Sequence, residues 1–163
     1  MKGPERVQAA LETAGLDISI VQLQKSARTA QMAADALGTA LGSIVKSLLF
    51  LADGKPVLVL VAGDRRADPA RLKKLLGAKR VMIADAERVR LETGFSIGGV
   101  PPIGHQRSLP TWIDASLARF ETVYAAAGHP HAVFPIAFEK LAHITGGHMA
   151  DVTKNPSTEE KKK

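Results

Sequence analysis

A lysine interrupts an apolar row in a segment that otherwise has the character of a buried strand. Side chains alternate along a strand, so Lys46 shares a face with Ile44, Leu48 and Phe50. A lysine near the start of such a strand can keep its methylenes buried and its ammonium in water. It can also point into a pocket, where the ammonium would hold a phosphate or a carbonyl oxygen that becomes negative in a transition state. The residues alone leave both interpretations open.

A loop of glycines and prolines at residues 98–104, Gly-Gly-Val-Pro-Pro-Ile-Gly, is the second candidate for chemistry. Glycine lets a ligand approach the backbone closely, and the two prolines stiffen the second half of the loop. The loop has neither the Gly-Lys-Ser/Thr of a phosphate-binding loop nor the Gly-x-Gly-x-x-Gly of a dinucleotide site. It is either a turn alone or a source of backbone N–H groups for an ester carbonyl.

The remaining reactive side chains argue against several kinds of enzyme. The chain has no cysteine, which excludes thiolate nucleophiles, disulfides and the usual structural zinc sites. Its five histidines include His129 and His131 but lack the spacing of metal ligands, and no serine nucleophile has a recognisable context. We therefore expect no metal and no cofactor. His105 follows the glycine loop, where it could order substrate or water or simply be a solvated loop residue.

The chain carries a net charge of +6, which favours a polyanionic partner such as RNA. Residues 64–80 hold seven basic side chains against two acidic ones. This stretch fits either an RNA backbone or a solvated helix face. The RNA-binding candidates are Arg65, Arg66, Arg71, Lys73 and Lys74. The N-terminus lacks an apolar signal core and no apolar run is long enough to span a bilayer, so we expect a soluble, cytoplasmic protein with no membrane or DNA partner.

Apolar residues at helical spacing, bounded by capping residues, predict the helices. Ser26 is predicted to cap the second helix and Asp68 the third, while Asp114 is more simply a helix cap than an acid or base. The predicted helices cover residues 4–15, 26–38, 68–77, 85–93 and 138–146.

Alternating or continuous apolar runs predict the strands. The Asp53-Gly54 pair between two of them is a strong signal for a hairpin. The predicted strands are Ile18–Leu23, Ile44–Leu51, Pro56–Ala62, Val81–Ala84, Phe95–Ile97, Thr111–Asp114, Val123–Ala126 and Ala132–Ile136.

This irregular mixture of elements predicts an α+β (mixed α/β) domain with a central, mostly antiparallel mixed sheet flanked by helices. We expect residues 1–154 to form a single domain. The polar segment 155–163 is predicted to be a disordered tail.

Several motifs, in the same order along the chain, resemble the YbaK/prolyl-tRNA editing family. They are Ile-Val-Lys-Ser-Leu-Leu-Phe at 44–50 and Gly-Gly-Val-Pro-Pro at 98–102, supported by segments 26–30, 75–81, 94–97 and 109–114. Members of this family are freestanding deacylases, or the editing insertion of bacterial prolyl-tRNA synthetase, and they hydrolyse the ester between a wrong amino acid and tRNA. The resemblance implies a YbaK-like fold and the same activity, without metal or cofactor.

The same resemblance implies a set of site residues. The family's lysine corresponds to Lys46, and its Gly-x-x-x-Pro loop to Gly98 and Pro102. We accordingly expect Lys46, Gly98 and Gly99 to be catalytic, with Lys46 acting electrostatically and water, or a hydroxyl or thiol of the substrate, as the nucleophile. The expected substrate-binding residues are Thr29, Ser47, Val100, Pro101, Pro102, His105 and Ala126.

The implied partner is mischarged tRNA, with tRNA-Pro as the expected species and prolyl-tRNA synthetase as a possible protein partner. Ala126 stands where cysteine-editing relatives carry serine, which favours alanyl, seryl, threonyl or 2-aminobutyryl esters over cysteinyl. Two alternatives stay open: a tRNA- or synthetase-binding module without activity, and a hydrolase or binder of free amino-acid derivatives.

Overall fold

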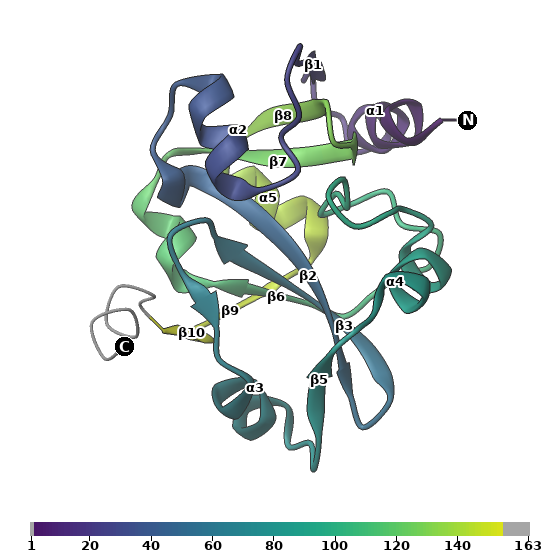
Figure 1. Ribbon diagram of the computed structural model, residues 1–163, viewed down its shortest axis with the longest axis vertical. Helices are drawn as coiled ribbons and strands as arrows, with labels where there is room; N and C mark the ends of the chain where they lie inside the picture. The colour runs from purple at the N-terminus through teal and green to yellow at the C-terminus, as the bar shows by residue number, and fades with distance from the viewer. Residues whose placement is uncertain (1, 155–163) are drawn as a thin grey trace.

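The structure, a computed structural model, describes residues 2–154 (Figure 1). The predicted tail at 155–163 lies outside the described residues. Five α-helices occur close to the predicted positions, and none of the helices in the described part combines the length and apolarity needed to cross a membrane. The helices are α1 (Gly3–Thr13), α2 (Ala30–Leu37), α3 (Pro69–Leu76), α4 (Ala86–Thr93) and α5 (Phe138–Thr145).

The strands form a mixed central sheet in the order β1-β8-β7-β2-β3-β6-β9, with β5 added beside β2, and β4 and β10 pair separately. Pairs β2–β3, β2–β5, β7–β8, β1–β8 and β4–β10 are antiparallel, whereas β2–β7, β3–β6 and β6–β9 are parallel. The predicted fold class is thus confirmed. The strands are β1 (Val21–Gln22), β2 (Ile44–Ala52), β3 (Lys55–Ala62), β4 (Arg66–Ala67), β5 (Val81–Ile83), β6 (Thr111–Asp114), β7 (Thr122–His129), β8 (Ala132–Ala137), β9 (His148–Ala150) and β10 (Thr153–Lys154).

The predicted hairpin is the longest pairing in the sheet. Its register runs from Val45 opposite Ala62 to Ala52 opposite Lys55. Asp53 and Gly54 take φ angles of 50° and 81°, as a tight hairpin turn with positive φ at both central residues requires. This turn fixes the register and therefore the face on which Lys46 lies.

The start of α2 differs from the prediction. Thr29 caps the helix, because its hydroxyl accepts a 3.1 Å hydrogen bond from the Met32 N–H, whereas the Ser26 hydroxyl accepts one from the Arg28 N–H. The reason is tertiary. The Ala27 N–H donates to the Pro130 carbonyl at 2.6 Å, which holds the preceding segment extended beside β8.

The predicted strand at Phe95–Ile97 was also wrong. This segment is a turn, in which the Phe95 N–H donates to the Thr93 hydroxyl and the Gly99 N–H donates to the Ser96 carbonyl. The short strands β4, β9 and β10 escaped prediction, because two or three residues carry no readable periodicity. The Asp114 cap is confirmed: its carboxylate accepts from the Ser116 N–H at the start of a 3₁₀ helix, η2 (Ala115–Arg119).

Helices cover both faces of the sheet. The larger core cluster joins α1, α4 and α5 to one face through Leu11, Val89 and Leu141, which pack with Val45 and Leu49 of β2. On the other face, separate clusters lie under α2 and α3, as α2 packs on Ile44 and α3 on Phe50. On this face of β2, Lys46 therefore lies between Ile44, which belongs to the cluster under α2, and Phe50, which belongs to the cluster under α3.

Candidate functional site

The sheet is open beside the middle of β2. On one edge, β7 pairs with β2 only at Ile44 and Val45, and β5 pairs with it only from Phe50 onward. Residues 46–49 have no strand partner there, although β3 covers their other edge completely. A gap in the sheet results, and it exposes the middle of a central strand from its edge.

A cavity of about 340 Å³ fills this gap. Its lining includes side chains from both faces of the sheet: Leu48 and Tyr124 lie on the α2 and α3 side, and Val45 and Leu49 lie on the other. Its full lining is Ala27, Arg28, Thr29, Ala30, Ala33, Leu37, Ile44, Val45, Lys46, Ser47, Leu48, Leu49, Ile83, Ala84, Val89, Ile97, Gly98, Val100, Tyr124, Ala125, Ala126 and Val133. Most of these side chains are apolar.

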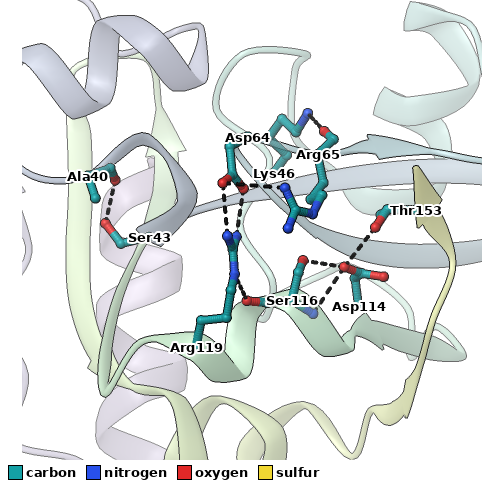
Figure 2. A network of polar contacts seen from close by, with 9 residues as sticks. All are labelled: Ala40, Ser43, Lys46, Asp64, Arg65, Asp114, Ser116, Arg119 and Thr153. Atoms are coloured by element: carbon teal, nitrogen blue, oxygen red, sulfur yellow. Dashed lines mark hydrogen bonds and ion pairs between the residues drawn. The ribbon is translucent and has the colours of Figure 1, made fainter. Parts of the chain in front are cut away.

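Lys46 lines this cavity while its ammonium is held at the far end of β3. Nζ donates a 2.6 Å hydrogen bond to the carbonyl oxygen of Arg65, in the turn between β3 and β4 (Figure 2). The side chain is half-buried. Burial and the nearby positive charge of Arg66 lower the pKa of Lys46, and Asp64 opposes them. Lys46 is thus neither a freely solvated surface lysine nor a fully enclosed one.

Asp64 supplies the negative charge of this neighbourhood, but it is shared. Arg119 of η2 holds it through two hydrogen bonds, of 2.6 and 3.0 Å, and Arg65 lies 3.7 Å from it (Figure 2). The hydrogen bonds from Arg119 lower the pKa of the Asp64 carboxyl. Near Lys46, the Asp64 carboxylate is thus held by Arg119 and lies close to Arg65, while Arg66 adds a further positive charge.

Gly98 also lines the cavity. Its φ of 96° is in the region that favours glycine, and an added Cβ would lie 2.8 Å from Cγ of Arg28. Only a glycine fits this conformation beside the Arg28 side chain. Lys46 and Gly98, predicted to act together from distant parts of the sequence, thus line the same cavity.

The loop that carries Gly98 is fixed from outside the cavity by Arg6 of α1. The Arg6 guanidinium donates to the carbonyl of Gly94 at 3.1 Å and to that of Gly104 at 3.4 Å, and lies 4.4 Å from the centre of the Phe95 ring. One side chain thereby ties together both ends of the loop. Nothing in the sequence around Arg6 indicated this contact.

Of the ten predicted catalytic and substrate-binding residues, six line the cavity and four do not. Lining it are Lys46, Gly98, Thr29, Ser47, Val100 and Ala126. Pro101 and Pro102 belong to the loop itself and are buried outside the cavity lining. Gly99 packs on the backbone of His129 and accepts a hydrogen bond from the Gly128 N–H, so it joins the loop to β7.

His105 shares in supporting the loop. Its Nε2 lies 2.7 Å from the Pro101 carbonyl, and its ring packs edge-on against Phe95. Burial lowers the pKa of His105, as does the charge of Arg6, while the bond to Pro101 opposes them. In this structure His105 contacts the protein backbone rather than the cavity.

The predicted RNA-binding side chains divide into two groups. Arg65 and Arg66 lie near Lys46. Arg71, Lys73 and Lys74 are exposed on α3, where Arg71 forms a 2.8 Å ion pair with Asp151 and a longer one with Asp68. Arg28, which was not singled out from the sequence, adds a cation to the cavity wall; it belongs to one of the segments that carry the family resemblance.

Comparison with known proteins identifies the family. The sequence pattern of the family described as "Aminoacyl-tRNA editing domain" matches residues 24–144. The chain belongs to this family. The matched segment contains β2, the glycine loop and every residue of the cavity lining, but not Arg6.

Individual relatives of this editing domain agree with the assignment. YwhH of Bacillus subtilis, an uncharacterized protein, is 32% identical over 127 residues, which are 77% of this chain and 80% of YwhH. The "Putative Cys-tRNA(Pro)/Cys-tRNA(Cys) deacylase EbsC" of Enterococcus faecalis is 27% identical, over 77% of each chain. A proline–tRNA ligase of Nitratidesulfovibrio vulgaris is 46% identical over 68 residues, 42% of this chain but only 12% of the ligase.

Solved structures show the same fold for this editing domain. A "putative trans-editing enzyme for prolyl tRNA synthetase" superposes with a TM-score of 0.89 at 41% identity, covering 95% of this chain and 99% of that one. The hypothetical protein APE2540 superposes with a TM-score of 0.85 at 31% identity, covering 91% and 99%. The fold and the family are therefore those expected from the motifs.

Proposed function

We propose that this chain hydrolyses the ester between an amino acid and the 3′-terminal ribose of a mischarged tRNA. Water adds to the acyl carbon, the bond from that carbon to the ribose oxygen breaks, and a proton from the water ends on the ribose oxygen. The products are a free amino acid and an uncharged tRNA. An aminoacyl ester is already activated, so the enzyme has mainly to position it and to stabilise the developing oxyanion.

The observation that carries this proposal is the meeting of Lys46 and Gly98 on one cavity. These are the residues to which the family resemblance assigned the chemistry, and 52 positions of sequence separate them. Gly98 and its neighbours would hold the ester carbonyl through backbone groups. The Gly99 N–H already donates to Ser96, which makes Gly98 and Val100 the stronger candidates for this contact.

Lys46 would act as a charge, not as a nucleophile. Its ammonium is bonded to the Arg65 carbonyl and lies near Arg66, and we expect it to hold the terminal phosphate or the carbonyl oxygen of the substrate. To reach either one, Nζ exchanges its bond to the Arg65 carbonyl for a bond to the ligand. Thr29, Ser47, Val100 and Ala126 would contact the aminoacyl group, while Pro101, Pro102 and His105 would support the loop.

Mischarged tRNA-Pro is the substrate we propose, with prolyl-tRNA synthetase as a possible partner. The support is the similarity to 68 residues of a proline–tRNA ligase and to the structure named for trans-editing. Editing is needed where a synthetase discriminates small side chains by only about 1–3 kcal/mol per methylene. We expect alanyl, seryl, threonyl or 2-aminobutyryl esters. EbsC is named for cysteinyl-tRNA, so a cysteinyl ester belongs in any test.

The test is a panel of tRNA-Pro molecules charged with Ala, Ser, Thr, Cys or 2-aminobutyrate. We expect the wild type to release at least one amino acid, and Lys46→Ala to lower that rate by about 10²–10³ with the melting temperature little changed. Lys55→Ala, at an exposed lysine of the same hairpin, is the matched control and should keep full activity. A fully active Lys46→Ala variant would refute the proposed mechanism.

The second candidate is a tRNA- or synthetase-binding module without turnover. The basic stretch at 64–80 favours it. It predicts salt-dependent RNA binding with no hydrolysis of any ester in the panel. A hydrolase of free amino-acid derivatives, by contrast, would keep its turnover when Arg71, Lys73 and Lys74 are reversed in charge.

A further inference from the structure

The hydroxyl of Ser47 is buried without a hydrogen-bond partner. Among the side chains at residues 2–154, Ser47 Oγ is the one buried nitrogen or oxygen atom that has no hydrogen-bond partner. A buried hydroxyl loses its bonds to water, and leaving it unpaired costs free energy that a ligand group can recover. Such an atom therefore needs an explanation, and its place in the fold offers one.

Ser47 lies on the wall of the cavity, on the side opposite Lys46. Side chains alternate along β2, so Ser47 shares its face with Val45 and Leu49, both of which line the cavity. The strand is also open at this point, since β7 ends its pairing at Val45 and β5 begins at Phe50. The backbone groups of Ser47 also face this open edge. The Leu49 carbonyl accepts a hydrogen bond from the Ala84 N–H at the same edge, and Ser47, two residues before Leu49, directs its own N–H and carbonyl to that edge.

The cavity lining around Ser47 offers no counter-charge to a cationic group. No residue in the cavity lining is acidic, and two, Arg28 and Lys46, are basic. The α-ammonium of an aminoacyl ester would find no counter-charge there. Most of the remaining lining is aliphatic, with Val45, Leu49 and Ala125 nearly fully buried, although Thr29 and Tyr124 also belong to it. A small, neutral group that carries a hydroxyl fits this wall better than a charged one.

We propose that Ser47 recognises the side-chain hydroxyl of a seryl or threonyl ester and so sets the preference of this site. The proposal rests on the proposed function and narrows its substrate. The Ser47 residue as a whole is only half-buried, and rotation about its Cα–Cβ bond moves the hydroxyl between staggered positions toward a ligand in the gap. An alanyl or 2-aminobutyryl group would fill the same space and leave Oγ unpaired.

The experiment compares kcat/KM of the wild type and Ser47→Ala on seryl-, threonyl-, alanyl- and 2-aminobutyryl-tRNA-Pro. We expect the wild type to favour the two hydroxyl-bearing esters. Ser47→Ala should lose about 10- to 100-fold on those two and little on the others. Equal losses on all four esters, or no loss on any, would overturn the proposal.

The matched control is Ser43→Ala. Ser43 is a serine of the same region that is buried as a whole, but its hydroxyl donates to the Ala40 carbonyl at 2.7 Å and it does not line the cavity (Figure 2). Ser43→Ala should have a lower melting temperature than the wild type and should rank the four esters by kcat/KM in the wild-type order. Ser47→Ala should melt at the wild-type temperature or above it, because it removes an unpaired group.

A binding arm separates this inference from the proposed function. The probes are 3′-amino-3′-deoxyadenosine acylated on its amine with serine or with alanine. Their amide bond is not an ester, so their affinity is measurable by titration whether or not the protein is a hydrolase. We expect the seryl amide to bind about tenfold or more tightly, and Ser47→Ala to abolish the difference. If the wild type hydrolyses no ester yet shows this difference, the proposed function fails and the role of Ser47 stands. Equal affinities for the two amides would overturn it.

Discussion

Nζ of Lys46 and the carbonyl oxygen of Arg65 are joined by a hydrogen bond of 2.6 Å. This bond attaches a side chain from the start of β2 to the turn after β3, where Asp64, Arg65 and Arg66 come together. The ammonium is oriented before any ligand arrives, and its charge state depends on its neighbours. The pH dependence of activity therefore reports on this pair.

If a protonated Lys46 is required, kcat should fall as the pH rises through the lowered pKa of its ammonium. Asp64 is the neighbour that raises this pKa, so Asp64→Asn removes a stabilising charge and also frees Arg119 as an added cation. Both effects disfavour the protonated form. We expect the alkaline limb of the pH–rate profile to move to lower pH in Asp64→Asn. Asp17→Asn, at an exposed position, should leave the limb in place, and an unmoved limb in Asp64→Asn would contradict the assignment.

Gly98→Ala should reduce turnover by more than about tenfold while costing about 1–2 kcal/mol of stability, because a side chain is strained at positive φ. The added Cβ also collides with Arg28 at the cavity wall. Gly54 provides the control: its φ of 81° is similar, but open space surrounds it in the hairpin turn. Gly54→Ala should lose comparable stability in thermal melts and keep its activity. If the two variants were equally active, Gly98 would have no role in the site.

Arg6→Ala should loosen the loop between Gly94 and Gly104. The substitution removes both hydrogen bonds and the contact with the Phe95 ring. Hydrogen exchange of amides in this segment should become at least several-fold faster, while those of β2 and β3 change little. Arg6→Lys should restore part of the protection, since it keeps the charge but not the paired donors. Lys2→Ala controls for the loss of a cation at the N-cap of the same helix, and it should leave the loop's exchange unchanged.

Charge reversal at Lys73 and Lys74 should weaken binding to tRNA and flatten its dependence on salt concentration. Removing one contact to a phosphate lowers the slope of log K against log salt by about 0.7–0.9. Arg71 is already paired with Asp151, so reversing it tests a different interaction. Lys140→Glu, at an exposed lysine of α5 on the other face of the sheet, is the control. If Lys140→Glu weakens binding as much as the α3 variants do, net charge and not this surface is responsible.

Local signals predicted most of the fold. Asp-Gly at the hairpin, Asp68-Pro69 at the start of α3, and the glycines that end α2, α3 and α5 each act within a few residues, so their effect can be recognised from sequence. The predictions failed where a distant segment decided the local conformation. Pro130 holds Ala27 extended and so moves the start of α2, while Arg6 and Thr93 shape a turn at Phe95 that resembled a strand.

By itself, the sequence determined the chemistry available: a lysine on an apolar strand face, a glycine–proline loop, no thiol, and motifs that resemble an editing family. The tertiary structure alone decided how these parts meet. The gap beside β2 depends on where β5 and β7 end their pairing, and Ser47, whose hydroxyl is unpaired, lies in that gap. Arg6 reaches Gly94 across 88 residues, and Arg119 reaches Asp64 across 55. Contacts at such separations arise from sheet order and helix packing, which leave no pattern in any short window of sequence.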